Sequence, residues 1–468
     1  MNQATFIILG ATGDLSKRKL IPAIYKLIKH KKIDRFALIG ASIKKTDIKT
    51  ILENSKKFIS NSEEKIWKKL ENYSYFFELD FYKSEKYQEF KKFIKEIEKR
   101  HKLKGNKIFY LATLPEHFKE ITKNLYENKI VTKYDHKNNC KDCNHPWSRI
   151  VYEKPFGHDL KSAKEINKCI RKLFHEKQIY RIDHYLGKEL VSNIALVRFT
   201  NRIFEPLWNN KHIDSIQIIL SEKIGIEGRG KFYDKYGAIK DVVQNHMLQI
   251  LSLIAMEQPK KLEAKYIRDV KAKILKKLIF KNAILGQYKG YTEEKNVNPK
   301  SKTETFAALK LEINNKRWKG VPFYLKTGKN LDKKETSVHI KFKMVKCLLT
   351  QGCPSDSNYL TIKITPSNGF YLELNSKEPQ TNNLIPVEMN FCHSCLFGPN
   401  TPEAYENLLF DVIKGDQSTF VRSDEIEYSW KLIDSIKKNK YKIYKYEKGS
   451  KGPKEINLLD NKIIRWRA

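Results

Sequence analysis

The first forty residues alternate between short apolar runs and a helical pattern, and no other feature constrains the fold as strongly. Residues 6–9 and 36–40 are apolar runs of strand length, and between them apolar residues recur at helical spacing from Leu20 to Ile28. The alternation continues over 84–100, 108–112, 116–127 and 150–152. A chain that alternates strands and helices in this way builds a parallel sheet with helices on both faces.

The pattern changes in the second half of the chain, where strands follow one another with few helices between them. Such strands pair mainly antiparallel. The expected fold class is therefore α/β plus α+β: a Rossmann-like dinucleotide-binding domain over 1–180, followed by a larger domain with a mainly antiparallel sheet over 181–468. The strands expected in the second domain are 212–220, 304–313, 337–342, 359–364 and 369–374. The helices expected there are 188–199, 240–256, 401–413 and 423–437, and the polar stretches 134–146, 289–303 and 376–384 are expected to be loops.

The charge of the chain raises the question of an anionic partner. There are 90 Lys and Arg against 54 Asp and Glu, a formal net charge of +36. A basic nucleic-acid-binding protein is one hypothesis, but the lysines are spread along the whole chain, and 40 % hydrophobic and 12 % aromatic residues indicate a folded protein. No apolar run approaches the roughly 18 residues of a membrane span, and residues 1–10 do not read as a signal peptide. We expect a cytoplasmic protein that binds neither nucleic acid nor membranes.

The turn after the first predicted strand reads GATGDL over 10–15. Glycines there let the backbone approach a pyrophosphate, and the following helix offers its N-terminal amides. The full G-x-G-x-x-G fingerprint is absent, so two glycines kept only for the geometry of the turn are the alternative. After the second strand come Lys44 and Lys45, with no acid before Asp47. This favours NADP over NAD, because basic residues accommodate a 2′-phosphate, although surface lysines would give the same pattern.

Two segments near the middle of the chain combine charged and aromatic groups. Residues 153–157 read EKPFG at the end of a predicted strand, where Lys154 could donate to a substrate hydroxyl. Asp183, His184, Tyr185 and Lys188 lie within six positions of one another. His, Tyr and Lys are donors that suit a phosphate monoester, and an Asp is a usual partner of an imidazole. A hydrogen-bonded loop without a ligand is the alternative.

The helix expected over 240–256 carries a polar stripe on an otherwise apolar surface. At 100° per residue the stripe contains Asp241, Asn245, Gln249 and Ser252, with His246 beyond its edge. A neutral imidazole facing a polar cavity can act as a general base, whereas a core histidine is the commoner outcome. Other candidate ligand-facing groups are Glu222, Lys329 and Lys334.

Seven cysteines in 468 residues fit free thiols in a reducing compartment. Cys140 and Cys143 form one C-x-x-C pair, and Cys392 and Cys395 form another. Together they could supply four zinc ligands, but they are about 250 residues apart, far beyond the spacing of a zinc ribbon. We therefore expect no metal.

Taken together, these segments resemble the glucose-6-phosphate dehydrogenase family. The matching stretches follow the family's order, and they include GATGDL at 10–15, RIVYEKPFG at 149–157, YRIDHYLGKE at 180–189, GIEGRG at 225–230, DVVQNHMLQIL at 241–251 and RWKGVPFYLKTGK at 317–329. The resemblance implies oxidation of glucose 6-phosphate at C1 to 6-phosphoglucono-δ-lactone with reduction of NADP, the first step of the oxidative pentose phosphate pathway. It also implies a homodimer or homotetramer. A homologue that keeps the architecture without turnover is the remaining alternative.

The resemblance also assigns roles to residues. His246 would be the catalytic base, and Asp183 would stabilise its imidazolium. The substrate-binding residues would be Lys154, His184, Tyr185, Lys188, Glu222, Asp241, Lys329 and Lys334. The cofactor-binding residues would be Gly10, Thr12, Gly13, Asp14, Leu15, Lys44, Lys45 and Lys154. Two places depart from the family: Ile43 stands where an arginine usually meets the 2′-phosphate, and the stretch 111–115 has one proline where two are typical. A lysine beside Ile43 lacks the fork of a guanidinium.

Overall fold

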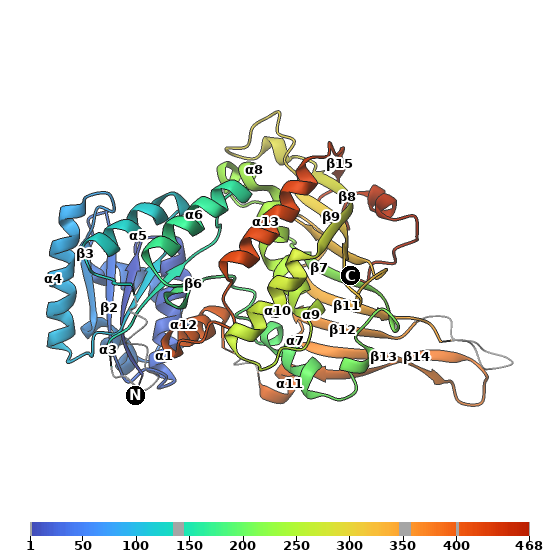
Figure 1. Ribbon diagram of the computed structural model, residues 1–468, viewed down its shortest axis with the longest axis horizontal. Coiled ribbons are helices and arrows are strands. Elements are labelled where there is room, and N and C mark those ends of the chain that lie inside the picture. Colours follow the sequence, from blue (N-terminus) through green and yellow to red (C-terminus); the bar gives the residue numbers. More distant parts are fainter. Residues whose placement is uncertain (1, 134–144, 346–356, 399–401, 468) are drawn as a thin grey trace. The chain divides into compact units, whose positions relative to one another are not determined.

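The computed structural model describes residues 2–133, 145–345, 357–398 and 402–467 (Figure 1). The chain forms two compact units. Unit 1 comprises Met1–Gly187, Leu262–Arg268 and Pro402–Ile426, and unit 2 comprises Lys188–Lys261, Asp269–Thr401 and Glu427–Ala468. The division into functional domains at residue 180 stays a prediction. Among the described residues, no helix has the length and apolar character needed to cross a membrane.

Unit 1 contains a six-stranded parallel sheet of order β3-β2-β1-β4-β5-β6. Its strands are β1 (Gln3–Leu9), β2 (Arg35–Ser42), β3 (Ser74–Glu78), β4 (Lys107–Leu111), β5 (Ser148–Tyr152) and β6 (Ile179–Arg181). Every residue of β1 is buried, as expected for a central strand covered on both faces. The order reverses direction beside β1, so the first strand-to-helix turn lies at the switch point where open sheets of this kind bind ligands.

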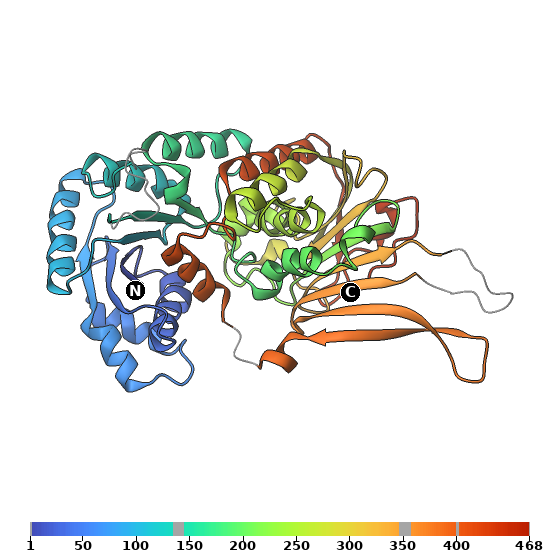
Figure 2. The same ribbon diagram turned by 60° about the horizontal axis from the view of Figure 1, so that its bottom comes forward.

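Helices cover both faces of this sheet. The helix α1 packs with α2, α3 and α12, whereas α5 packs with α4 and α6, and the two groups lie on opposite sides of the strands (Figure 2). These helices are α1 (Ile21–Lys29), α2 (Ile48–Lys56), α3 (Glu64–Asn72), α4 (Ser84–Arg100), α5 (Phe118–Glu127), α6 (Leu160–Leu173) and α12 (Ala404–Lys414). Local sequence fixes several ends, since Asp47 caps α2 and Asp159 forms a capping box with Ser162 at α6. The parallel, helix-covered sheet expected from the sequence is confirmed.

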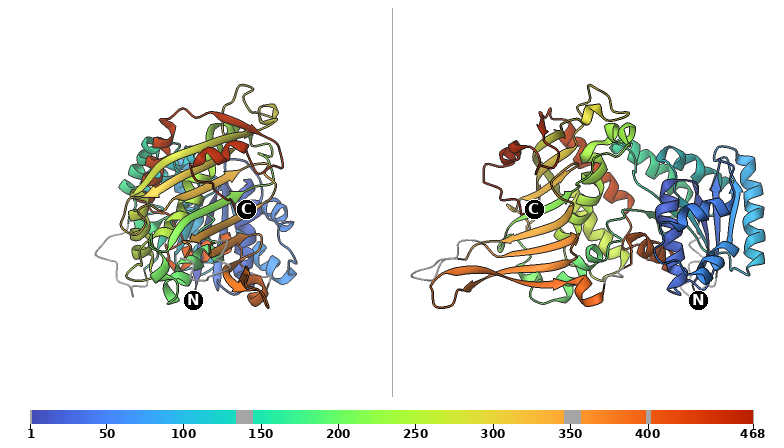
Figure 3. Two further views of the ribbon diagram at one scale, coloured as in Figure 1. Left: turned by 90° about the vertical axis from the view of Figure 1, so that its right-hand side faces the viewer. Right: turned by 180° about the vertical axis from the view of Figure 1, so that it is seen from behind.

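Unit 2 contains a nine-stranded sheet of order β14-β13-β12-β11-β7-β10-β9-β8-β15. Its strands are β7 (Ile213–Ser221), β8 (Leu278–Tyr288), β9 (Phe306–Ile313), β10 (Phe323–Gly328), β11 (Glu335–Phe342), β12 (Tyr359–Thr365), β13 (Gly369–Lys377), β14 (Leu384–Cys392) and β15 (Ile443–Tyr446). The pairing is mainly antiparallel, as expected, but β7 pairs with β10 and β8 with β15 in parallel. The strands β13 and β14 form a long hairpin at one edge (Figure 3).

Helices α7 (Glu189–Thr200), α8 (Gly230–Ala238), α9 (Leu248–Ala255) and α11 (His393–Phe397) belong to unit 2, whereas α10 (Ala264–Lys276) and α13 (Ser423–Lys437) contribute residues to both units. Between α8 and α9 the segment Ile239–Met247 is a π-helix, η6. The helix expected over 240–256 is therefore present, but its first half is a π-helix and only its second half is an α-helix. A hydrogen-bond pattern of i to i+5 in η6 also makes the 100° wheel used for the polar stripe inapplicable there. Most of the expected loop 134–146 lies outside the described residues.

Candidate active-site residues

The turn predicted to bind the cofactor follows β1 directly. Gly10 has a φ of +91°, and a Cβ atom on it would lie 2.6 Å from the carbonyl oxygen of Ala112. The amide of Gly13 donates to the carbonyl oxygen of Gly10 at 3.0 Å, which closes the turn before the first helical residues. Only glycine fits the first position, because both the left-handed backbone and the contact with Ala112 exclude a side chain. These contacts are therefore also compatible with the alternative that the two glycines are kept only for the geometry of the turn.

The end of β2 carries the two candidate lysines. Thr12 and Ser42 share a hydrogen bond of 3.1 Å between their hydroxyl oxygens, which joins the first turn to the end of β2. Lys44 and Lys45 are exposed. Asp47 accepts hydrogen bonds at 2.8 Å from both the amide and the hydroxyl of Thr50, and these bonds lower the pKa of its carboxyl. The carboxylate of Asp47, the first acid after the two lysines, is therefore already hydrogen-bonded at the start of α2.

Lys154 follows a buried carboxylate at the end of β5. Glu153 is 8 % exposed and accepts hydrogen bonds from the hydroxyl groups of Tyr110 and Tyr405, the latter at 3.2 Å. Burial raises the pKa of the Glu153 carboxyl, and the two tyrosine hydrogen bonds oppose that shift. The side chain of Glu153 is thus anchored by two tyrosines directly before Lys154.

The segment from Asp183 to Tyr185 follows β6, with Asp183 buried and His184 and Tyr185 partly exposed. Asp183 is 2 % exposed and accepts a hydrogen bond of 3.0 Å from the amide of Tyr185. The rings of His184 and Tyr185 have centroids 4.9 Å apart. Gly187 ends the segment under α12, where a Cβ atom would lie 2.7 Å from the carbonyl oxygen of Ala404. Segment 402–426 therefore closes over these residues within unit 1.

In unit 2 the strand register brings Glu222 and Lys329 together. Glu222 follows β7 and Lys329 follows β10, and these strands are parallel with Ser221 opposite Gly328. The ammonium of Lys329 lies 2.5 Å from the Glu222 carboxylate, and Lys329 is only 2 % exposed. Lys334 precedes β11, whose first residue, Glu335, pairs with Ser221. Glu222, Lys329 and Lys334, which the sequence analysis named in separate motifs, thus lie at the same end of three adjacent strands of the sheet.

The remaining predicted residues of unit 2 lie in or beside helices. Lys188 is the N-cap residue of α7 and donates to the hydroxyl of Thr365 at 3.3 Å. Asp241 and His246 lie in η6, and His246 is 3 % exposed. The side-chain amide of Asn245 donates to the carbonyl oxygen of Asp241 at 3.0 Å. This amide group therefore bonds within η6 and does not face a cavity as a free donor.

A partly buried glutamate that the sequence did not single out anchors η6. The amide of Ala238 donates to the backbone carbonyl of Glu304 at 3.0 Å, and the amide of Ile239 donates to its carboxylate at 3.1 Å. Burial raises the pKa of this carboxyl. Gly237 lets it approach, since a Cβ atom there would lie 2.5 Å from Glu304 Oε1. The local sequence around Gly237 and Glu304 does not predict their contact, because the two residues are far apart in the sequence.

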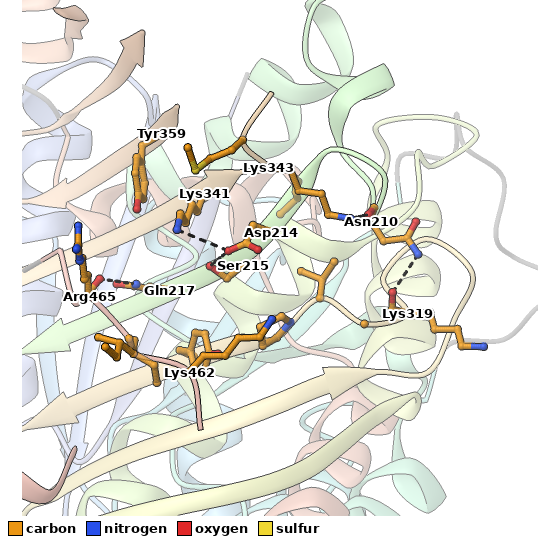
Figure 4. A pocket seen from close by; sticks show the side chains of 18 residues that line it. Asn210, Asp214, Ser215, Gln217, Lys319, Lys341, Lys343, Tyr359, Lys462 and Arg465 are labelled. Atoms are coloured by element: carbon orange, nitrogen blue, oxygen red, sulfur yellow. Dashed lines mark hydrogen bonds and ion pairs between the residues drawn. The ribbon is translucent and has the colours of Figure 1, made fainter. Parts of the chain in front are cut away.

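A pocket of about 580 Å³ on the sheet of unit 2 contains none of the predicted residues (Figure 4). Lys341 faces Asp214 across it at 3.9 Å, and Gln217 donates to the carbonyl oxygen of Arg465 at 2.9 Å.

Elsewhere in unit 2, Cys392 and Cys395 form a disulfide, so the expectation of free thiols is wrong for this pair. Cys140 and Cys143 lie outside the described residues.

Comparison with known proteins gives matches over the whole chain. The family model described as glucose-6-phosphate dehydrogenase, NAD binding domain, matches residues 7–193, and that of the C-terminal domain matches residues 195–467. The glucose-6-phosphate 1-dehydrogenase of Bacillus subtilis is 41 % identical, covering 99 % of this chain and 98 % of that protein. A protein of Arabidopsis thaliana, glucose-6-phosphate 1-dehydrogenase 6, cytoplasmic, is 38 % identical over 97 % of this chain and 90 % of its own length.

Solved structures agree with these matches. A glucose-6-phosphate dehydrogenase in complex with its substrate glucose-6-phosphate superposes with a TM-score of 0.89 at 33 % identity, covering 97 % of this chain and 96 % of that one. The enzyme from Mycobacterium avium gives 0.87 at 31 % identity, with coverage of 99 % and 98 %. A levoglucosan dehydrogenase, at 10 % identity and a TM-score of 0.52, shares the fold alone.

Proposed function

Because the chain belongs to the glucose-6-phosphate dehydrogenase family, its activity is that of a glucose-6-phosphate 1-dehydrogenase, and we propose that it works with NADP through the residues described above. The activity oxidises C1 of glucose 6-phosphate and belongs to the pentose phosphate pathway. Full-length coverage by relatives at about 40 % identity is the observation that supports this conclusion.

We propose His246 as the base that removes the proton of the C1 hydroxyl. A buried imidazole is suited to this task because its neutral form accepts a proton near neutral pH. Asp183, equally buried, is proposed to stabilise the imidazolium that forms, as carboxylates do beside catalytic histidines. The nicotinamide cofactor, when bound, accepts the hydride that leaves C1.

The substrate is proposed to be held by two sets of groups. His184, Tyr185 and Lys188 supply the imidazole, phenol and ammonium donors that suit a phosphate monoester. Glu222, Asp241 and Lys329 supply carboxylates and an ammonium that suit sugar hydroxyls, and Lys154 and Lys334 add further cations. The ion pair between Lys329 and Glu222 orients both groups.

The preference for NADP over NAD is proposed from the end of β2. The residues of this chain that would hold the cofactor are Gly10, Thr12, Gly13, Asp14 and Leu15 at the first turn, with Lys44 and Lys45 for the 2′-phosphate. The segment after Ser42 offers two exposed lysines and no acid, and the carboxylate of Asp47 is committed to Thr50. An acidic partner for an unphosphorylated ribose is therefore lacking among residues 42–46.

We further propose a cytoplasmic homodimer or homotetramer. The Arabidopsis relative carries the word cytoplasmic in its name. The edge strand β14 exposes Ile385, Val387 and Met389 on one face, an apolar row that a second copy of the chain would cover. Light scattering of the purified protein tests this, and a monomer at micromolar concentration would contradict it.

The decisive experiment for the function measures reduced nicotinamide by its absorbance while glucose 6-phosphate is oxidised. We expect turnover with NADP and a lower kcat/KM with NAD. A folded protein that is inactive with both cofactors would contradict the function, and equal kcat/KM values would contradict only the cofactor preference.

A further inference from the structure

The phenol hydroxyl of Tyr233 has no hydrogen-bond partner in the described part of the chain, although the residue is 1 % exposed. Tyr233 lies in α8. Buried hydroxyl groups are nearly always hydrogen-bonded, because leaving one without a partner costs the free energy of its desolvation. This exception needs an explanation, and one explanation is a ligand that supplies the missing group.

The surroundings of Tyr233 are the groups proposed to bind the sugar. The ammonium of Lys329 lies 5.7 Å from the centroid of the Tyr233 ring, and the same ammonium pairs with Glu222 at 2.5 Å. The negative charges of Asp241, Glu304 and Glu222 also act on the phenol. Tyr233 therefore shares its environment with three residues of the proposed hydroxyl-binding set, all within unit 2.

The protonation of Tyr233 suits a hydrogen-bond donor. Burial, and then the charge of Asp241, raises the pKa of the phenol well above its usual value of 10. The hydroxyl thus keeps its proton at neutral pH.

The helix that carries Tyr233 is held by contacts of the residues around it. The adjacent Asp234 accepts a hydrogen bond of 3.0 Å from the hydroxyl of Tyr291, and its carbonyl accepts one of 2.7 Å from Thr303. At the start of α8, a Cβ atom on Gly230 would clash with the carbonyl oxygen of Lys295. These contacts hold α8 against the segment 291–303 and hold Tyr233 in place.

We propose that Tyr233 is a further substrate-binding residue, whose hydroxyl donates to one hydroxyl group of the glucose ring. This rests on the proposed roles of Glu222, Asp241 and Lys329. Bound substrate then supplies the partner that the phenol lacks in the protein alone. Because a single hydroxyl is involved, Tyr233 contributes to discrimination among sugar phosphates as well as to affinity.

The test combines Tyr233→Phe with glucose 6-phosphate analogues that each lack one hydroxyl, at C2, C3 or C4. We expect kcat/KM on glucose 6-phosphate to fall roughly threefold to tenfold, the usual effect of losing one neutral hydrogen bond. On the one analogue that lacks the partner hydroxyl, wild type and variant should be equal. An equal loss on every analogue, or no loss on glucose 6-phosphate, would overturn the proposal.

Thermal unfolding of Tyr233→Phe gives an independent readout. Removing a hydroxyl that has no partner should raise the melting temperature, on the order of 1 °C, while activity falls. A structural hydrogen bond, for instance to a buried water, would instead make the melting temperature fall, which would overturn the proposal.

The matched control is Tyr291→Phe. Its ring packs edge-on against that of Tyr233 at 6.3 Å, and its hydroxyl already donates to Asp234. We expect this variant to melt at a lower temperature and to affect all analogues equally. Wild-type protein that does not oxidise glucose 6-phosphate would instead refute the function itself, before any variant is compared.

Discussion

The ring of Tyr405 lies nearly parallel to the imidazole of His184, with centroids 6.3 Å apart and an angle of 11° between the planes. The hydroxyl of the same tyrosine donates to Glu153 at 3.2 Å. Tyr405 thus connects the buried carboxylate before Lys154 with a proposed phosphate-binding residue. Its own phenol pKa is raised by burial and by the charge of Glu153, so it stays a donor.

We expect Tyr405→Leu to raise the KM for glucose 6-phosphate several-fold with little change in kcat, because the imidazole of His184 loses the ring that orients it. Tyr405→Phe keeps the ring and should have the smaller effect. Initial-rate kinetics measure both. Tyr82→Leu, at a tyrosine that is 57 % exposed, is the control and should leave KM unchanged.

Tyr405 also illustrates what the sequence did not predict. The helix over 401–413 was expected, but nothing in its pattern indicates that it packs beside a segment more than 200 residues earlier. The same limit applies to Glu304. Its hydrogen bond with the amide of Ile239 joins residues 65 positions apart, which local periodicity does not report.

What the sequence did predict has a local cause. The parallel sheet followed from alternating apolar runs and helical patterns, and the candidate turn at Gly10 followed from its position after the first strand. Glu222 and Lys329 were both named, but as separate motifs. Their pairing required the parallel register of β7 and β10, an exception in a sheet expected to be mainly antiparallel.

The buried carboxyl of Glu153 should make stability depend on pH. Burial raises its pKa above the usual 4.5, so in a window above that pH the folded state binds more protons than the unfolded state. The contribution of Glu153 to stability therefore falls as the pH rises through this window. Glu153→Gln cannot ionise, and its amide oxygen can still accept from both tyrosines.

We therefore expect the melting temperature of Glu153→Gln, relative to wild type, to be higher at about pH 7 than at about pH 4. Scanning calorimetry at the two pH values measures this difference. A difference that does not change with pH, or that changes in the opposite direction, would contradict the raised pKa.

His246→Asn should remove most turnover while glucose 6-phosphate still binds. The loss of a general base typically costs 10²–10⁴-fold in rate, so we expect kcat to fall within that range and the dissociation constant to change little. Asp183→Asn should lower kcat as well. If the two residues act as one unit, the double variant will lose little more than His246→Asn alone. Additive losses would separate Asp183 from the base, and retained turnover in His246→Asn would displace it as the base.

Lys44→Ala combined with Lys45→Ala should raise the KM for NADP but not that for NAD. Losing charged hydrogen bonds to a 2′-phosphate is worth about tenfold in affinity. The paired replacement is needed because either ammonium can substitute for the other as a point charge. Lys31→Ala and Lys32→Ala, at exposed lysines after α1, form the control. An equal rise for both cofactors would assign Lys44 and Lys45 to the general surface charge.

Gly237→Ala should damage catalysis through the anchor of η6. Gly237 has a φ of +64°, which costs a residue with a side chain about 1–3 kcal/mol, and its Cβ atom would lie 2.5 Å from the Glu304 carboxylate. That carboxylate holds the amide of Ile239 at the start of the segment that carries His246.

Gly320→Ala separates the two effects. Gly320 has a φ of +84°, but no atom lies within 4 Å of where its Cβ would be. Both variants should lose stability from the left-handed backbone, as urea unfolding will show. Only Gly237→Ala should also lose kcat, because only there is the carboxylate displaced. If the two variants lose kcat equally, or if Gly237→Ala keeps the wild-type value, the contact with Glu304 does not position the base.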